Sequence, residues 1–144
     1  DWGDYVGRLL VLYLVIVVKA SDTGAFFIGC SFGKHKLIPR ISPAKSWEGF
    51  FGGILAGLLA SVLFMLISRG LIGTVSLTWT DALVLGVFLP AIGTAGDLTE
   101  SLFKRAAGVK DSGRIILGMG GVLDVLDSLL FTAPILYVYA RFFM

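Results

Sequence analysis

The stretch Phe50–Ser68, FFGGILAGLLASVLFMLIS, contains no charged residue. A helix that crosses the hydrocarbon core of a bilayer needs about 20 mostly apolar residues, and this run meets that requirement. The composition agrees, because 56% of the residues are hydrophobic and only 15% are charged, against about 25% charged in an average soluble domain. The mean hydropathy is +0.89. We therefore expect a membrane protein.

Three further apolar stretches, Tyr5–Ala20, Ala82–Gly96 and Val122–Tyr139, are separated by polar loops. We predict an all-α fold, a polytopic transmembrane helical bundle whose polar loops on the cytoplasmic face hold short helices or strands. It forms a single domain over residues 1–144 with about four spans, at 5–20, 47–68, 78–96 and 120–142. The chain opens without an initiator methionine or a signal peptide, so we expect the C-terminal part of a longer protein.

Lysine and arginine concentrate in two of the predicted loops. Gly29–Trp47 and Lys104–Arg114 together hold eight of the twelve basic residues, whereas the loop Arg69–Thr80 holds only Arg69. Basic loops remain on the cytoplasmic side of a membrane. We therefore expect both basic loops in the cytoplasm and both ends of this chain on the other side.

Aspartates mark the predicted cytoplasmic ends of the spans, at Asp22, Asp97, Asp124 and Asp127. Ionisable groups at membrane depth are costly and normally functional. Asp124 and Asp127 are three residues apart and share a helix face, where two carboxylates repel unless a cation lies between them or one is protonated. Oxygen ligands suit Mg²⁺, which often binds substrate phosphates. This favours a metal site over the alternative that the aspartates only cap helices.

Basic residues flank the two aspartates in the sequence, at Lys104, Arg105 and Lys110. Beside a metal–carboxylate site, such cations neutralise phosphates and stabilise a charged leaving group; the alternative is that they only set orientation and contact anionic lipid. The pattern predicts a membrane-embedded, metal-dependent enzyme acting on phosphates. The chain has no G-x-x-x-x-G-K-[ST] motif of a P-loop NTPase, and its single cysteine, Cys30, excludes an intramolecular disulfide.

The stretch Ser101–Asp127, SLFKRAAGVKDSGRIILGMGGVLDVLD, resembles the signature of CDP-diacylglycerol synthases, also called phosphatidate cytidylyltransferases. That signature has S-x-x-K-R, then K-D, a glycine-rich turn and D-R-x-D. The preceding GDLTE and the stretch Ser21–Gly53 are also similar to the family. Leu117, Met119 and Val125 stand where the signature has proline, histidine and arginine, but both aspartates of the last motif are present.

The resemblance implies a reaction of phospholipid biosynthesis in which CTP and phosphatidic acid give CDP-diacylglycerol and pyrophosphate. It implies Mg²⁺ as the cofactor and leaves open a second cation, either divalent or K⁺. The expected partners are CTP, phosphatidic acid and the lipid bilayer, with no nucleic acid. A homodimer is left open, because glycine-rich faces can pack helix against helix. The expected location is a bacterial inner membrane, with the active site facing the cytoplasm.

The resemblance, together with the chemistry above, assigns roles to three groups of residues. The predicted catalytic residues are Asp97, Asp124, Asp127, Lys104, Arg105 and Lys110, with the three aspartates as metal ligands. The predicted substrate-binding residues are Ser21, Asp22, Thr23, Lys34, Lys36, Lys45, Gly120 and Gly121. The alternatives are a CTP-dependent lipid kinase, an ether-lipid cytidylyltransferase, a transporter subunit or a catalytically weakened homologue.

Overall fold

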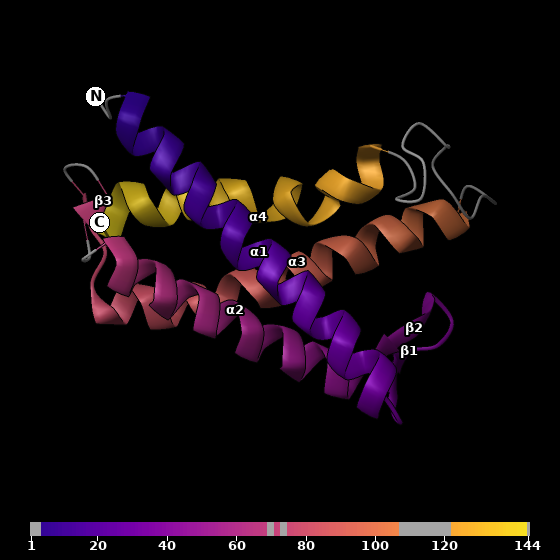
Figure 1. The fold of residues 1–144 in the computed structure, drawn as a ribbon. Helices are drawn as coiled ribbons and strands as arrows, with labels where there is room; N and C mark the ends of the chain where they lie inside the picture. The colour runs from indigo at the N-terminus through magenta and orange to yellow at the C-terminus, as the bar shows by residue number, and fades with distance from the viewer. Residues whose placement is uncertain (1–3, 69–70, 73–74, 107–121, 144) are drawn as a thin grey trace.

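The computed structural model describes residues 4–68, 71–72, 75–106 and 122–143. Within these residues the chain forms a bundle of four helices (Figure 1), which are α1 (Asp4–Phe32), α2 (Trp47–Ser68), α3 (Trp79–Ala106) and α4 (Val122–Phe143). Two antiparallel pairs of short strands lie between helices: β1 (Lys36–Ile38) with β2 (Ser42–Ser46), and β3 (Leu71–Ile72) with β4 (Val75–Ser76). The predicted helical bundle with polar loops is confirmed.

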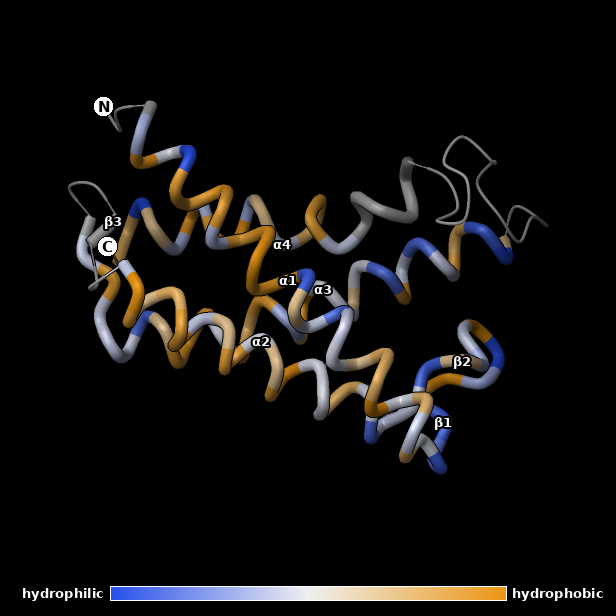
Figure 2. Tube along the Cα trace, viewed as in Figure 1, coloured by the Kyte–Doolittle hydropathy of each residue, from blue (hydrophilic) through white to orange (hydrophobic). Residues whose placement is uncertain are grey.

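Three of the helices are long and apolar enough to cross a membrane, over Tyr5–Phe32, Trp47–Ser68 and Trp79–Ala106. The hydropathy view shows apolar residues along the helices and polar residues gathered at β1, β2 and the end of α3 (Figure 2). α4 has 22 residues, the same length as α2. Its described side chains give a shorter apolar segment, Ser128–Phe143, so the fourth crossing stays a prediction.

Two helices extend well beyond the spans that hydropathy predicts. α1 continues to Phe32 and has 29 residues, and α3 continues to Ala106 and has 28. Lys104 and Arg105 therefore lie in the last turn of α3, and the prediction that they belong to a loop is wrong. The residues after Gly96 include no proline and several good helix formers, and basic side chains stabilise the C-terminus of a helix.

The four helices place their polar ends together. The end of α1, the start of α2, the end of α3 and the start of α4 lie at the same end of the bundle as β1 and β2 (Figure 1). The start of α1 and the end of α4 lie at the opposite end, with β3. The hairpin and the end of α3, which carry basic residues from both basic segments, therefore share one end of the molecule.

Small residues bring α1 and α2 into close contact. A Cβ atom added to Gly24 would lie 2.4 Å from the Cβ of Ala56 and 3.1 Å from the carbonyl oxygen of Gly52. One added to Gly53 would lie 3.1 Å from the carbonyl oxygen of Ser21. Small residues permit such close backbone approach in membrane helices, so the two helices form a tight pair.

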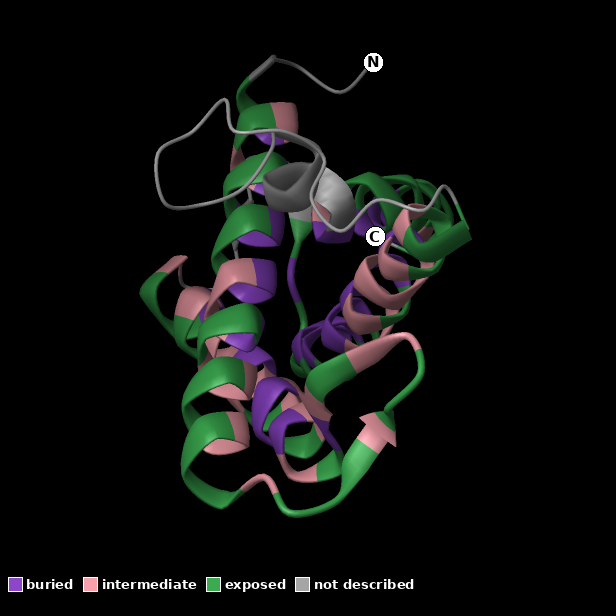
Figure 3. Ribbon diagram, turned by 90° about the vertical axis from the view of Figure 1, so that its right-hand side faces the viewer, coloured by how far each residue is buried: buried purple, intermediate pink, exposed green. Residues whose placement is uncertain are grey.

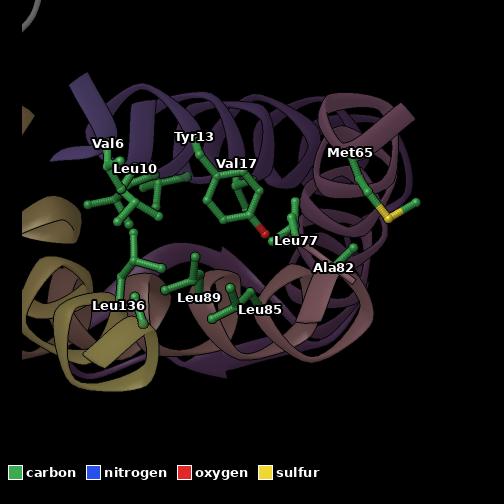
Figure 4. Packing of buried hydrophobic residues seen from close by; sticks show 13 residues of the cluster. Val6, Leu10, Tyr13, Val17, Met65, Leu77, Ala82, Leu85, Leu89 and Leu136 are labelled. Carbon is green, nitrogen blue, oxygen red and sulfur yellow. The ribbon is translucent and has the colours of Figure 1, made fainter. Parts of the chain in front are cut away.

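The apolar core lies on the inward faces of the helices (Figure 3). Figure 4 shows Tyr13 and Val17 of α1 facing Leu85 and Leu89 of α3, and all four are buried. The Tyr13 hydroxyl donates to Ser61 Oγ at 2.7 Å, because Ser61 donates its own proton to the Ala82 carbonyl at 2.7 Å. The buried hydroxyl groups are thus satisfied, as an apolar environment requires.

A second polar cluster lies at the end of the bundle opposite the β1–β2 hairpin. Asp81 accepts a hydrogen bond from the Thr78 backbone N–H at 2.9 Å, and Thr78 Oγ1 accepts one from the Asp81 N–H at 3.3 Å, so the two residues form a capping box at the start of α3. The second carboxylate oxygen of Asp81 accepts a hydrogen bond from the Tyr139 hydroxyl at 2.8 Å. These bonds join the start of α3 to the end of α4, far from the basic hairpin.

The tight α1–α2 contact predicts a position-specific response to one methyl group. Gly24→Ala is expected to destabilise the protein by about 1–3 kcal/mol, because the added Cβ meets rigid backbone and Ala56. The control is Gly7→Ala on the same helix, where a Cβ would meet nothing within 4 Å; it is expected to be neutral or slightly stabilising. Thermal unfolding in detergent measures both, and equal effects would contradict the packing.

Candidate functional site

A pocket of about 330 Å³ opens at the polar end of the bundle, between the β1–β2 hairpin and the helix ends. Its polar lining comes from four different elements and consists of Asp22, Lys45, Ser46, Thr94, Asp97 and Ser128. Phe26, Leu37 and Phe50 add an apolar wall. The pocket therefore offers both charged and apolar surface where the bundle meets the polar hairpin.

One ion pair joins the two sides of this pocket. Lys45 of β2 reaches across to α3, where its Nζ contacts Asp97 Oδ2 and lies 3.5 Å from the Thr94 carbonyl oxygen. Both side chains remain accessible, with 22% of Lys45 and 40% of Asp97 exposed. A carboxylate and an ammonium group, both open to solvent, therefore meet in the pocket.

The junction between β2 and α2 positions Lys45. Ser46 is buried, and its Oγ accepts a hydrogen bond from the Gly49 backbone N–H at 3.1 Å, so it caps α2. The Trp47 N–H donates to the His35 carbonyl at 3.0 Å, which closes the hairpin. These two bonds fix the residues on the C-terminal side of Lys45.

The structure separates the three predicted substrate-binding residues of α1. Asp22 lines the pocket and forms an ion pair with Lys19 at 3.1 Å. Ser21 is buried against Gly53 of α2. Thr23 donates its hydroxyl proton to the Lys19 carbonyl at 2.8 Å. Asp22 is therefore the one of the three that the pocket brings together with Lys45 and Asp97.

Lys34 and Lys36 line a different pocket, on the other face of the hairpin. Leu37 faces the first pocket, whereas its neighbours Lys36 and Ile38 are exposed. This follows from the alternation of side chains along a strand. The hairpin thus presents Lys45 on one face and Lys34 and Lys36 on the other.

Lys104 and Arg105 lie in the last turn of α3, about two turns after Asp97. They are not among the residues that line the first pocket. Lys104 forms an ion pair with Glu100 at 2.9 Å, and Glu100 is only 8% exposed. Glu100 is not among the site residues predicted from the sequence. Its position four residues before Lys104 is typical of a helical ion pair and could have indicated it.

Asp124 and Asp127 belong to the first turns of α4, but their side chains lie outside the described residues. The register places Asp124 one turn before Ser128, which is buried and lines the pocket. Lys110, Gly120 and Gly121 lie outside the described residues altogether. The predicted roles of these residues stay predictions.

The described part of the chain contains no group of three His, Cys, Asp or Glu side chains close enough to hold a metal ion. That search does not include Asp124 and Asp127, so the three-aspartate metal site stays a prediction. Two carboxylate residues, Asp22 and Asp97, line the pocket, and Mg²⁺ accepts carboxylate oxygens as ligands. Each of them is paired with a lysine in this structure, Asp22 with Lys19 and Asp97 with Lys45.

Four further residues line the pocket that are not among the site residues predicted from the sequence: Cys30, Ser46, Thr94 and Ser128. Ser46 precedes Trp47-Glu48-Gly49, and a serine directly before a helix is a recognised start signal. Ser128 follows Asp124 by one helical turn. The other two have no signal in the sequence, because only the packed helices bring them to the pocket.

The chain is similar in sequence to a known protein family and to individual bacterial proteins. A family model described as "Cytidylyltransferase family" matches residues 3–143. The phosphatidate cytidylyltransferase of Haemophilus influenzae is 47% identical over 141 residues, which are 97% of this chain and 48% of that protein. That of Bacillus subtilis is 43% identical over 140 residues, which are 97% of this chain and 50% of that protein. The chain thus spans about half the length of these relatives.

A solved structure has a similar fold. It is described as an intramembrane enzyme for archaeal membrane lipids biosynthesis, and it superimposes with a TM-score of 0.65 over 90% of this chain and 77% of its own. The identity between the two sequences is 21%. This similarity supports the arrangement of the helices in an integral membrane protein.

Proposed function

The chain belongs to the cytidylyltransferase family, and we propose that it transfers the cytidylyl group of CTP to phosphatidic acid. A phosphate oxygen of the lipid attacks the α-phosphorus of CTP. The bond from the α-phosphorus to the oxygen that bridges it to the β-phosphorus breaks, so CDP-diacylglycerol forms and pyrophosphate leaves. The observation that carries this proposal is the pocket in which Lys45 and Asp97 meet at the polar end of a membrane bundle.

The two substrates come from different phases, and the pocket suits both. Phosphatidic acid lies in the bilayer and CTP in water, so the reacting groups must meet at the membrane surface. Polar side chains from four elements line one part of the pocket, and Phe26, Leu37 and Phe50 line another. Its volume of about 330 Å³ lies within the range of about 300–1,000 Å³ that is common for small-molecule sites.

The basic residues near the pocket are proposed to bind the phosphate groups of the substrates and the product. Lys45 is proposed to hold phosphate oxygens of the substrates, because its ammonium group lies in the pocket and remains partly exposed. Lys104, Arg105 and Lys110 are proposed to contact the pyrophosphate, with Glu100 orienting Lys104. Preorganised cations of this kind stabilise charge that develops on a leaving group.

Asp97, Asp124 and Asp127 are proposed to hold Mg²⁺. The ion would supply a Lewis acid that withdraws charge from the phosphate oxygens. The support is the oxygen-rich lining around Asp97 and the register of α4, in which Asp124 precedes the pocket residue Ser128 by one turn. A second cation, either divalent or K⁺, remains part of the proposal.

The remaining substrate-binding candidates have unequal support. Asp22 lines the pocket and is proposed to contact the nucleotide or the lipid headgroup. Ser21 and Thr23 make contacts within the helices, which favours a structural role for both. Gly120 and Gly121 are proposed to let the backbone approach a substrate, on the strength of the family resemblance alone.

The proposed location is a bacterial inner membrane with the pocket facing the cytoplasm. The relatives above are bacterial, and basic segments at the polar end of the bundle favour the cytoplasmic side. A homodimer is proposed as well. It is supported by large apolar side chains that α3 leaves exposed, among them Leu83, Val87 and Phe88, which either lipid or a second copy would cover.

Radiolabelled CTP tests the reaction and separates it from a kinase. The detergent-purified chain with Mg²⁺, phosphatidic acid and CTP labelled at the α-phosphate is expected to yield a labelled lipid. CTP labelled at the γ-phosphate is expected to label pyrophosphate only. A lipid labelled from the γ-phosphate would instead identify a CTP-dependent kinase, and no labelled lipid from either would contradict the proposal.

The same assay tests the role of Asp97. Asp97→Asn is expected to lower the rate at least about 100-fold, since it removes a charge from the site that handles the phosphates. Asp81→Asn changes an aspartate at the opposite end of the bundle and is the control; it should lower stability but keep most of the rate of the folded protein. Comparable losses in the two variants would refute a specific role for Asp97.

Cys30 provides a test of the orientation, because it is the single cysteine and lines the pocket. A membrane-impermeant maleimide is expected to label it in inside-out vesicles of the bacterial inner membrane and not in right-side-out vesicles. Mg²⁺ with CTP should slow this labelling severalfold by occupying the pocket. Labelling only in right-side-out vesicles would reverse the proposed orientation.

A further inference from the structure

The outer face of the β1–β2 hairpin forms a second pocket, which the proposed reaction does not use. Its volume is about 780 Å³, and it is lined mainly by Lys34, His35, Lys36, Trp47, Glu48 and Phe51. Leu37 and Lys45 lie on the opposite face of the hairpin and line the first pocket. The two pockets therefore share the hairpin as a common wall.

The charge of this second pocket favours an anion. Lys34 and Lys36 are exposed, and no ion pair joins either of them to another residue in the described ranges. The carboxylate of Glu48 is already engaged, because the His35 backbone N–H lies 3.3 Å from each of its oxygens and His35 Nδ1 lies 2.7 Å from Oε1. Two lysine ammonium groups thus remain available for a ligand.

The aromatic side of the pocket continues into the lipid-facing surface of α2. Trp47 and Phe51 stack at a centroid distance of 6.2 Å and an interplanar angle of 29°. They begin a series of large apolar residues, one at every fourth position of α2, and every member is exposed: Trp47, Phe51, Leu55, Leu59, Leu63 and Ile67. Because α2 is apolar enough to cross a membrane, this series faces acyl chains.

We propose that this pocket binds the headgroup of an anionic phospholipid, with its phosphate between Lys34 and Lys36 and its acyl chains along Trp47 and Phe51. The juxtaposition matches the ligand, since basic groups lie at the headgroup level and the aromatic rings lie at the membrane–water boundary. The site keeps an anionic lipid next to the hairpin that forms the wall of the first pocket. It does not depend on turnover.

Fluorescence quenching by brominated lipids tests this site. Trp2→Phe with Trp79→Phe leaves Trp47 as the single tryptophan of the chain. The variant is placed in phosphatidylcholine vesicles in which about one lipid in ten is brominated, either phosphatidylglycerol, which is anionic but is not the proposed substrate, or phosphatidylcholine. We expect brominated phosphatidylglycerol to quench Trp47 about two- to fivefold more than brominated phosphatidylcholine, because each basic residue near an anionic lipid contributes about 1 kcal/mol of attraction.

Variants within the hairpin separate a site from general surface charge. Lys34→Gln and Lys36→Gln should each lower the quenching by phosphatidylglycerol toward that of phosphatidylcholine. Arg40→Gln removes one charge from the same hairpin outside the pocket and should keep the preference. Equal quenching by both lipids, or an equal loss in Arg40→Gln, would overturn the proposal.

Native mass spectrometry provides a second, independent measurement. The unmodified chain should retain phosphatidylglycerol over phosphatidylcholine, and Lys34→Gln with Lys36→Gln should lose that preference; retention that is equal for both lipids would contradict the site. Neither experiment includes CTP. A negative result here therefore leaves the cytidylyl transfer assay unaffected, and an inactive chain would leave the lipid preference unaffected.

Discussion

The close contact of α1 and α2 determines the rest of the polar end. Because Gly24 and Gly53 let the two helices touch through their backbones, the segment between the helices, residues 33–46, must bring the chain back beside α1. It does so as the β1–β2 hairpin, which Ser46 and Trp47 fasten to the start of α2 and to β1. Lys45 is thereby directed toward α3. Larger residues along this contact would separate the helices and displace the hairpin from Asp97.

The polar side chains at the two ends of the bundle differ in how far they are enclosed. At one end, the carboxylate of Asp81 and the hydroxyl of Tyr139 satisfy each other, and Ser61 connects Tyr13 to a backbone carbonyl. Such bonds are needed where no water reaches the backbone. At the other end, Lys45 and Asp97 remain partly exposed in a pocket. Polar groups are therefore enclosed within the bundle at the first end, whereas Lys45 and Asp97 stay open to solvent at the second.

Hydropathy was sufficient to predict the membrane bundle, and the bounds of α2, Trp47–Ser68, agree with the predicted span. It did not predict that α1 and α3 continue past their apolar segments, because polar residues can extend a helix without an apolar signal. The sequence placed Asp22, Lys45 and Asp97 among the site candidates, and the structure brings them into one pocket. The sequence alone did not indicate that Lys45 lines this pocket and that Lys34 and Lys36 do not, since that depends on the strand register.

The shared hairpin wall has a consequence for how this sequence can change over evolutionary time. Along β1, Leu37 lies on one face and its neighbours Lys36 and Ile38 are exposed on the other, so one inserted or deleted residue exchanges the faces of every residue that follows in this strand. Leu37 would then take the place of Lys36. Substitutions can alter one pocket at a time, whereas a change of length alters both. The length of this segment is therefore more tightly constrained than its composition.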